Sequence, residues 1–173
     1  LSMQKQKLKA LGTIFLLMAA ISHATAEVTL VRFGPEGEEK PGIIDSEGQL
    51  RDLSSYVSEI TPETLSPASL QAIAELTLED LPAVAGEPRL GVPLTGIGKI
   101  IAIGFNYINH AAEMEVQLPD EPLTFMKATS ALTGPFDQII QPRNGQKLDY
   151  EAELVVVIGR RAQYISEEDV FDY

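Results

Sequence analysis

Apolar and polar residues alternate along the chain after residue 26, and the alternation breaks at clusters of turn-forming residues. The run EVTLVRF alternates, GPEGEEKPG follows it, and IIDSEGQLRDL divides into two short runs around SEG. A period of two is typical of half-buried strands, and Gly, Pro, Asp and Ser mark the turns between them. The pattern therefore predicts three strands in a small β-rich module.

The pattern becomes helical between residues 54 and 85. Pro62 and Pro67 are helix breakers, and the run SPASLQAIAEL carries apolar residues at helical spacing. The predicted core positions of this region are Leu65, Leu70, Ile73 and Leu76. The following stretch, LPAVAGEPRLGVPLTGIGK, is dense in Pro and Gly and has no period, so it predicts a linker with a domain boundary near residue 95.

The rest of the chain predicts strands with one short helix among them. KIIAIGFNY is an apolar strand that enters a turn, INHAAEME can form a short helix, and EPLTFMKATSALTGPFDQIIQP predicts two β segments around a Gly-Pro turn. KLDYEAELVVVIG predicts a further strand that ends at Gly159. Ser166 and Asp169 form a capping-box pattern that opens a helix close to the last residue, and this indicates that the chain is a fragment.

The N-terminus has the pattern of a secretory signal. Lys5, Lys7 and Lys9 precede the uncharged run ALGTIFLLMAAI, and small residues follow at Ala24 and Ala26. This pattern predicts cleavage after Ala26, with a periplasmic or otherwise exported mature chain. The apolar run is shorter than the roughly 20 residues of a spanning helix, so no membrane span is expected in the mature chain. A buried helix or a mistranslated upstream extension is the alternative, and either would leave the protein in the cytoplasm.

Charge and cysteine content exclude several classes of function. The chain has 25 acidic and 13 basic residues, for a net charge of -12, and the acidic residues are spread along it. Such a charge repels phosphate backbones and argues against binding to nucleic acid. The absence of cysteine excludes disulfides, thiolate metal sites and thiol nucleophiles within this sequence.

Two glutamates, Glu151 and Glu153, stand at the start of the apolar run LVVVIG. In a strand they would face the same side, with Cα atoms roughly 6.5 to 7 Å apart, and could converge on one ion. Hard oxygen ligands suit Mg²⁺, Mn²⁺ or Ca²⁺, and without a cation the two charges repel. A solvated strand face is the alternative, but Val155 and Val157 continue the same face and predict that it becomes buried.

His110 and Glu113 are three residues apart in the predicted short helix. That spacing places them on one face, where the carboxylate can orient an imidazole that acts as a general base. A surface pair without a catalytic role is the alternative. Lys127, beside Ser130 in FMKATSAL, could hold an anionic substrate, or it could simply extend its ammonium group to solvent.

With these motifs in order, the chain resembles the fumarylacetoacetate hydrolase family. The resemblance rests on KIIAIGFNYINHAAEM, EPLTFMKATSALTGP and KLDYEAELVVVIGRRAQYISEEDV, which follow one another in the family's order between residues 98 and 173. The earlier run VRFGPEGEEKPGIID resembles the N-terminal domain of bacterial members. The resemblance implies an α+β fold that is mainly β: a signal-like segment at 1–26, a small N-terminal domain at 27–95, and the first part of a mixed β-sandwich or roll catalytic domain at 96–173.

The resemblance also implies a site. Glu151 and Glu153 would hold Mg²⁺ or Mn²⁺, ahead of Ca²⁺, together with an Asp whose place falls beyond Tyr173. His110 and Glu113 would activate water from a mobile lid, and Lys127 and Ser130 would bind substrate. The full-length protein is expected to form a homodimer.

The implied reaction is hydrolysis of a carbon–carbon bond in a 2-oxo or 1,3-diketo acid, or related lyase or isomerase chemistry, through a metal-bound enolate. Ile103 stands seven residues before His110, where fumarylacetoacetate hydrolases themselves carry a further Asp ligand. This difference favours a smaller, pyruvate-like diketo acid as substrate. The alternative is a truncated or exported binding module that lacks the third ligand and is catalytically incompetent, and the fragment by itself is expected to be inactive.

Overall fold

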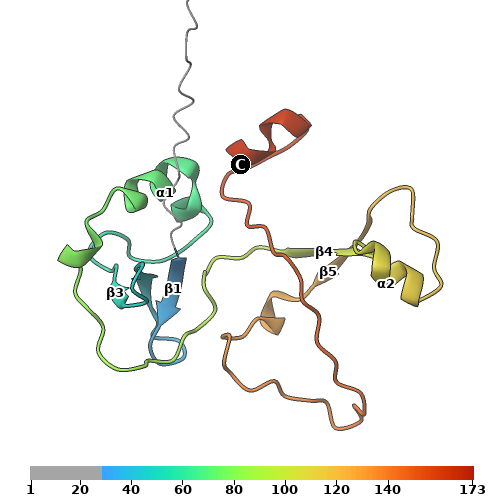
Figure 1. Ribbon diagram of the computed structural model, residues 1–173, viewed down its shortest axis with the longest axis horizontal. Helices are drawn as coiled ribbons and strands as arrows, with labels where there is room; N and C mark the ends of the chain where they lie inside the picture. The colour runs from blue at the N-terminus through green and yellow to red at the C-terminus, as the bar shows by residue number, and fades with distance from the viewer. Residues whose placement is uncertain (1–28) are drawn as a thin grey trace, which may run out of the picture.

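A computed structural model of the protein describes residues 29–173 (Figure 1). The signal-like segment at 1–26 lies outside the described residues. The first sheet contains three antiparallel strands in the order β1-β2-β3, namely β1 (Thr29–Phe33), β2 (Lys40–Ile44) and β3 (Leu50–Asp52). These are the three strands that the alternating pattern predicts. Between β2 and β3 the Asp45 carboxylate accepts hydrogen bonds from the amides of Glu47 and Gln49, which fixes the turn.

One helix and two short 3₁₀-helices complete the core of this region. Helix α1 (Pro67–Ala74) has Pro67 in its first turn, and the Ser66 hydroxyl caps it by accepting a hydrogen bond from the Ser69 amide. The 3₁₀-helix η1 (Glu63–Leu65) precedes α1, and η2 (Leu78–Asp80) follows it. The hydrophobic core consists of Ile43, Leu53, Ile73 and Leu81. Of the helical positions predicted as core, Ile73 is buried and Leu76 packs against it, whereas Leu65 and Leu70 remain partly exposed.

The Pro- and Gly-rich segment predicted to be a linker pairs with both edges of the first sheet. An isolated bridge joins Ala83 to Arg51 of β3, and another joins Leu90 to Phe33 of β1. The Gly34 amide donates to the Arg89 carbonyl over 2.9 Å. Because edge strands present unpaired backbone groups, this segment satisfies donors and acceptors that would otherwise face solvent.

A second sheet has only two strands, β4 (Ile100–Gly104) and β5 (Leu123–Lys127), which are antiparallel. Helix α2 (Ile108–Glu113) lies between them in the sequence, at the predicted position, and η3 (Thr129–Ala131) follows β5. Figure 1 shows this pair and α2 beside the first sheet, with α1 on the opposite side of the molecule. The prediction of a second β segment after the Gly-Pro turn is wrong, because residues 135–142 form no strand. The chain is thus α+β and mainly β, with few helices, as predicted.

The prediction of a strand at 147–159 is wrong. Residues 147–158 are without regular secondary structure, and Leu154, Val155 and Val156 are 85%, 77% and 73% exposed. The predicted burial of the glutamates' face is therefore wrong as well. A strand needs a neighbouring backbone to accept its hydrogen bonds, and within the described part of the chain this segment pairs with none.

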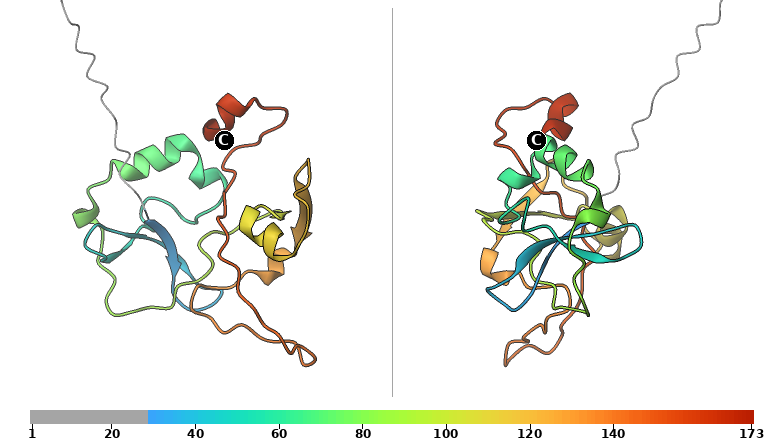
Figure 2. Two further views of the ribbon diagram at one scale, coloured as in Figure 1. Left: turned by 45° about the vertical axis from the view of Figure 1, so that its right-hand side comes forward. Right: turned by 90° about the vertical axis from the view of Figure 1, so that its left-hand side faces the viewer.

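The end of the described chain runs back toward α1 (Figures 1 and 2). At Gly159 the approach is close, since a Cβ atom there would lie 2.6 Å from the Leu65 carbonyl oxygen. The final helix is the 3₁₀-helix η4 (Glu167–Asp172), in which the Ser166 hydroxyl donates to the Asp169 carboxylate over 2.8 Å. Across residues 29–173 no helix has the length and apolar character needed to cross a bilayer.

Candidate functional site

Three segments that are distant in sequence meet near the two glutamates. They are the turn and helix after β4, the end of β5, and residues 151–153. Lys127 Nζ lies 3.7 Å from Glu151 Oε2, and Asn106 Nδ2 donates to Glu153 Oε2 over 3.2 Å. The tertiary structure therefore brings a cation and an amide donor to the glutamates that the sequence singles out.

His110 and Glu113 lie on one face of α2. Their Nδ1 and Oε2 atoms are 3.9 Å apart, which is too long for a hydrogen bond, and their side chains are 54% and 79% exposed. The predicted pair is thus close enough to interact after a small side-chain rotation. The Phe105 ring stacks on the imidazole with centroids 6.1 Å apart and planes inclined by 23°.

Phe105 has a positive φ of 52° at the end of β4. This left-handed conformation is uncommon for an aromatic residue. It turns the chain from the strand into α2 and places Asn106 and Tyr107 beside residues 151–153, which are called the glutamate segment below. There the Tyr107 hydroxyl donates to the Ala152 carbonyl over 3.2 Å. The turn is therefore the part of the structure that connects the helix of His110 with the segment of Glu153.

Lys127 stands at the end of β5, and its ammonium nitrogen is also 6.0 Å from the Phe125 ring centroid. The Lys127 and Glu151 side chains are 49% and 67% exposed, so their ion pair contributes little to stability. Ser130 lies in η3, and no hydrogen bond or ion pair of the described residues joins it to either glutamate. Two contacts therefore join four of the six predicted site residues, His110 with Glu113 and Lys127 with Glu151. Glu153 instead contacts Asn106, and Ser130 remains separate.

Sequence reasoning missed Asn106 and Tyr107 as site residues. Both belong to the stretch GFNYINH, directly before α2, so the signal available was their proximity to His110. Their contacts with residues 152 and 153 span 45 and 47 positions in the sequence. No local pattern encodes a pairing over that distance.

The chemistry of Glu151 and Glu153 suits a hard divalent cation. Mg²⁺ usually keeps several waters and binds through one or two carboxylates together with substrate oxygens. Within residues 29–173 no group of three or more His, Cys, Asp or Glu side chains is placed to hold a metal. Two carboxylates, with water and substrate as the other ligands, therefore fit Mg²⁺ or Mn²⁺ and do not form a closed protein cage.

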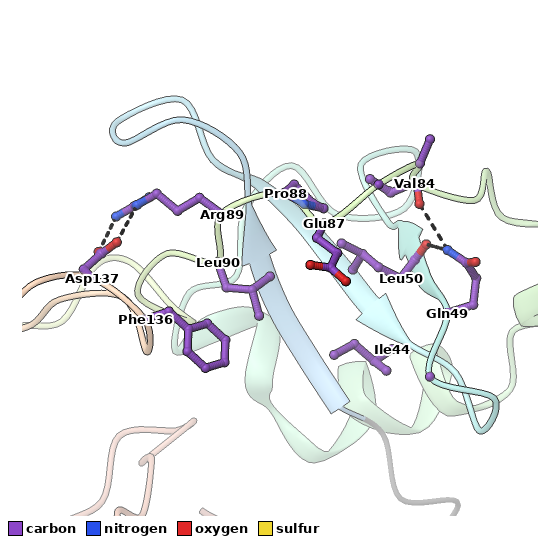
Figure 3. Close-up of a pocket in the computed structure, with 13 residues that line it drawn as sticks. Ile44, Gln49, Leu50, Val84, Glu87, Pro88, Arg89, Leu90, Phe136 and Asp137 are labelled. Carbon is purple, nitrogen blue, oxygen red and sulfur yellow. Dashed lines mark hydrogen bonds and ion pairs between the residues drawn. The ribbon is translucent and has the colours of Figure 1, made fainter.

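A second charged cluster lies outside this site and joins the first sheet to the turn at 133–137. Arg89 makes bidentate contacts with Asp137 over 2.8 and 2.6 Å and also pairs with Glu39 over 2.7 Å. The Arg89 guanidinium lowers the pKa of Asp137 from 3.8 to about 2, and it also lowers the pKa of Glu39. Figure 3 shows this pair at one end of a hollow that Glu87 and Phe136 also line, and none of the predicted site residues borders it.

Residues 99–173 match the family described as "Fumarylacetoacetate (FAA) hydrolase C-terminal". A 2,4-didehydro-3-deoxy-L-rhamnonate hydrolase of Sphingomonas sp. (strain SKA58) is 51% identical over 138 residues, which are 80% of this chain and 47% of that protein. A hydrolase of Burkholderia orbicola (strain MC0-3), named without a substrate, is 45% identical over 144 residues, which are 83% of this chain and 51% of that protein.

Among solved structures, a fumarylacetoacetate hydrolase from Exiguobacterium antarcticum is 24% identical, with a TM-score of 0.48 over 65% of this chain and 40% of that one. The chain thus spans about half the length of the curated relatives that it matches.

Proposed function

The chain belongs to the fumarylacetoacetate hydrolase family, and on this basis we propose that it forms part of a divalent-metal-dependent enzyme that hydrolyses a carbon–carbon bond in a 2-oxo or 1,3-diketo acid. The proposal is carried by two contacts: the ion pair of Lys127 with Glu151, and the hydrogen bond from Asn106, in the turn before α2, to Glu153. Motifs that are separate in the sequence thereby contact one another, and His110 lies in the helix that follows the turn.

Glu151 and Glu153 would hold Mg²⁺ or Mn²⁺. The ion supplies Lewis-acid stabilisation of negative charge on substrate oxygens. Lys127, at 3.7 Å from Glu151, would bind the substrate carboxylate next to that position. Ser130 would add a hydrogen bond after a change in the segment that follows β5, because in this structure it makes no contact with the glutamates.

The substrate class is supported by the Sphingomonas relative. That protein is named for 2,4-didehydro-3-deoxy-L-rhamnonate, an acid oxidised at positions 2 and 4. We extend that class, and not the particular compound, to this chain. Ile103, seven residues before His110, carries no carboxylate, and for this reason a smaller, pyruvate-like diketo acid is the proposed substrate.

His110 is the proposed general base. Its Nδ1 lies 3.9 Å from Glu113 Oε2, and a hydrogen bond formed there after a small rotation would leave Nε2 to accept a proton from water. The water oxygen then bonds to the carbonyl carbon at position 4, and the bond between carbons 3 and 4 breaks. Its electron pair passes to carbon 3 and is delocalised over the neighbouring oxo group. The imidazolium returns the proton to carbon 3, which gives one carboxylic acid and one 2-oxo acid.

Turnover of acylpyruvates by the full-length protein, with and without Mg²⁺ or Mn²⁺, tests this proposal. We expect metal-dependent release of a 2-oxo acid, its loss in Glu151→Ala and His110→Ala, and little change in Glu121→Ala, which removes an exposed carboxylate outside the site. Unchanged turnover in Glu151→Ala or His110→Ala would overturn the assignment of the site.

A binding module without catalysis is the second candidate. It is favoured by the two exposed carboxylates, which are joined in the described part of the chain by no third acidic or histidine ligand. Isothermal titration separates the two candidates, because stoichiometric micromolar binding of Mn²⁺ contradicts a module that cannot hold metal. Weak or absent binding together with absent turnover favours it.

Two further parts of the proposal concern location and assembly. Residues 1–26 would be a signal that is removed on export, and intact mass of the cell-associated protein should then give a chain that begins at Glu27. Ile101, Met126 and Val155 are 56%, 68% and 77% exposed, and burying such surface favours a homodimer. Sedimentation equilibrium would reveal a monomer if this is wrong.

A further inference from the structure

Two adjacent residues of the β4–α2 turn hold two adjacent residues of the glutamate segment. Asn106 Nδ2 donates to Glu153 Oε2 over 3.2 Å, and the Tyr107 hydroxyl donates to the Ala152 carbonyl over 3.2 Å. One bond restrains a side chain and the other restrains the backbone beside it. Together they fix both the position and the direction of the glutamate segment relative to the turn.

We propose that Asn106 and Tyr107 are positioning residues that hold the helix of His110 against the glutamate segment. Their two hydrogen bonds, to Glu153 and to Ala152, are called the clip below. Ordering one side of the site then orders the other. The clip is a property of the chain without metal, whereas its consequence for cation binding rests on the proposed function.

The glutamate segment needs such a restraint because secondary structure supplies none. Residues 147–158 pair with no strand of the described chain, so few backbone contacts limit their motion. A free glutamate also loses side-chain entropy when it binds an ion. The two turn residues restrict this freedom before the ion arrives, and such partners of metal ligands strongly affect metal affinity.

The chemistry of Asn106 suits the role better than a cation would. Its amide donates to one carboxylate oxygen without adding positive charge, so the negative charge of Glu153 stays available to a divalent ion. Lys127 makes the opposite kind of contact with Glu151, since its ammonium neutralises part of the charge that an ion would use. The two glutamates are therefore unequal, and Glu153 is the one that is oriented without being neutralised.

Phe105 completes the clip at its other end. Its left-handed backbone, with φ of 52°, directs the next two residues toward the glutamate segment. Its ring stacks on His110, so the same turn contacts the proposed base. Tyr107 is also the N-cap residue of α2, and its carbonyl accepts from the Ala111 amide over 3.1 Å. Movement of Tyr107 is thereby transmitted to the start of the helix.

Millisecond amide hydrogen exchange on the metal-free protein tests the clip directly. Tyr107→Phe removes only the side-chain hydroxyl, and Asn106→Ala removes the side-chain amide and leaves the backbone intact. We expect the helical amides of Ala111 and Met114, which donate to the Tyr107 and His110 carbonyls, to exchange several-fold faster in both variants. The matched controls Tyr164→Phe and Gln117→Ala change exposed side chains outside α2 and the glutamate segment and should leave this exchange unchanged. Unaltered exchange in Tyr107→Phe and Asn106→Ala would overturn the proposal.

Titration with Mn²⁺ tests the consequence for the ion. Asn106→Ala should weaken binding by roughly 10- to 100-fold, as is typical when a partner of a metal ligand is removed. Gln117→Ala should bind as the parent does. Equal affinities of Asn106→Ala and the parent would refute the role of the clip in metal binding. If the parent binds no Mn²⁺, the proposed function fails, and the exchange measurement still decides whether the clip exists.

Discussion

Lys127 and Glu151 form an exposed ion pair, with Nζ 3.7 Å from Oε2, at the point where β5 meets the glutamate segment. The pair places an ammonium group beside a carboxylate that would hold a divalent ion. Lys127 thus has two opposite effects on the proposed site, because it repels the metal and attracts an anionic substrate.

Lys127→Met should separate these two effects. Without the ammonium, Mn²⁺ should bind roughly 2- to 5-fold more tightly, which is the size expected for one charge at this distance in water. The KM for an anionic substrate should rise over the same change. The control is Lys147→Met, which changes an exposed lysine that does not pair with Glu151. Calorimetry and initial rates report the two effects separately, and weaker Mn²⁺ binding in Lys127→Met would contradict the repulsion.

His110→Asn should lower kcat by about 10²- to 10⁴-fold if the imidazole takes the proton from water. Glu113→Gln should have a smaller effect, because that carboxylate is 3.9 Å away and only orients the ring. Steady-state rates at saturating metal measure both. A larger effect of Glu113→Gln than of His110→Asn would reverse the assigned roles.

The Arg89–Asp137 pair should make stability depend on pH in the acid range. The pKa of Asp137 is lowered from 3.8 to about 2 by Arg89, so the folded state favours the ionised carboxylate. Its contribution is complete above pH 3.8 and is lost as the pH falls toward 2. Urea unfolding between pH 6 and pH 2 should show this loss in the parent.

In Asp137→Asn that part of the pH dependence should disappear, and the protein should be less stable at pH 6. Asp120→Asn changes an exposed carboxylate and should retain the parent's dependence. Identical curves for Asp137→Asn and the parent would show that the pair does not contribute.

Ile43→Ala should destabilise the first sheet by about 2 to 5 kcal/mol, because the Ile43 side chain of β2 is fully buried in the core with Ile73 of α1 and its removal leaves a cavity. Ile140→Ala, at a position that is 90% exposed, should change the free energy of unfolding by no more than about 0.5 kcal/mol. Chemical denaturation compares the two. Equal effects would mean that Ile43 is not part of a packed core.

Local patterns alone predicted most of the regular elements. The alternation in β1 and on both sides of the Asp45 turn, the apolar run at Ile100–Gly104 and the helical spacing at 67–74 are confirmed. Each depends on contacts between residues near one another in sequence. The residues of the proposed site were also visible as motifs. Their roles stay a prediction.

The tertiary structure decided what those segments contact. The run at 147–159 has strand-like residues, yet a strand forms only where another backbone can pair with it, and the described chain supplies no partner there. Leu90 pairs with Phe33 although the Pro- and Gly-rich sequence around Leu90 predicts a linker. The reason is that β1 is an edge strand whose outer backbone groups have no other partner in the sheet. Asn106 reaches Glu153 across 47 residues. Such pairings depend on the path of the whole chain, and no short stretch of sequence encodes that path.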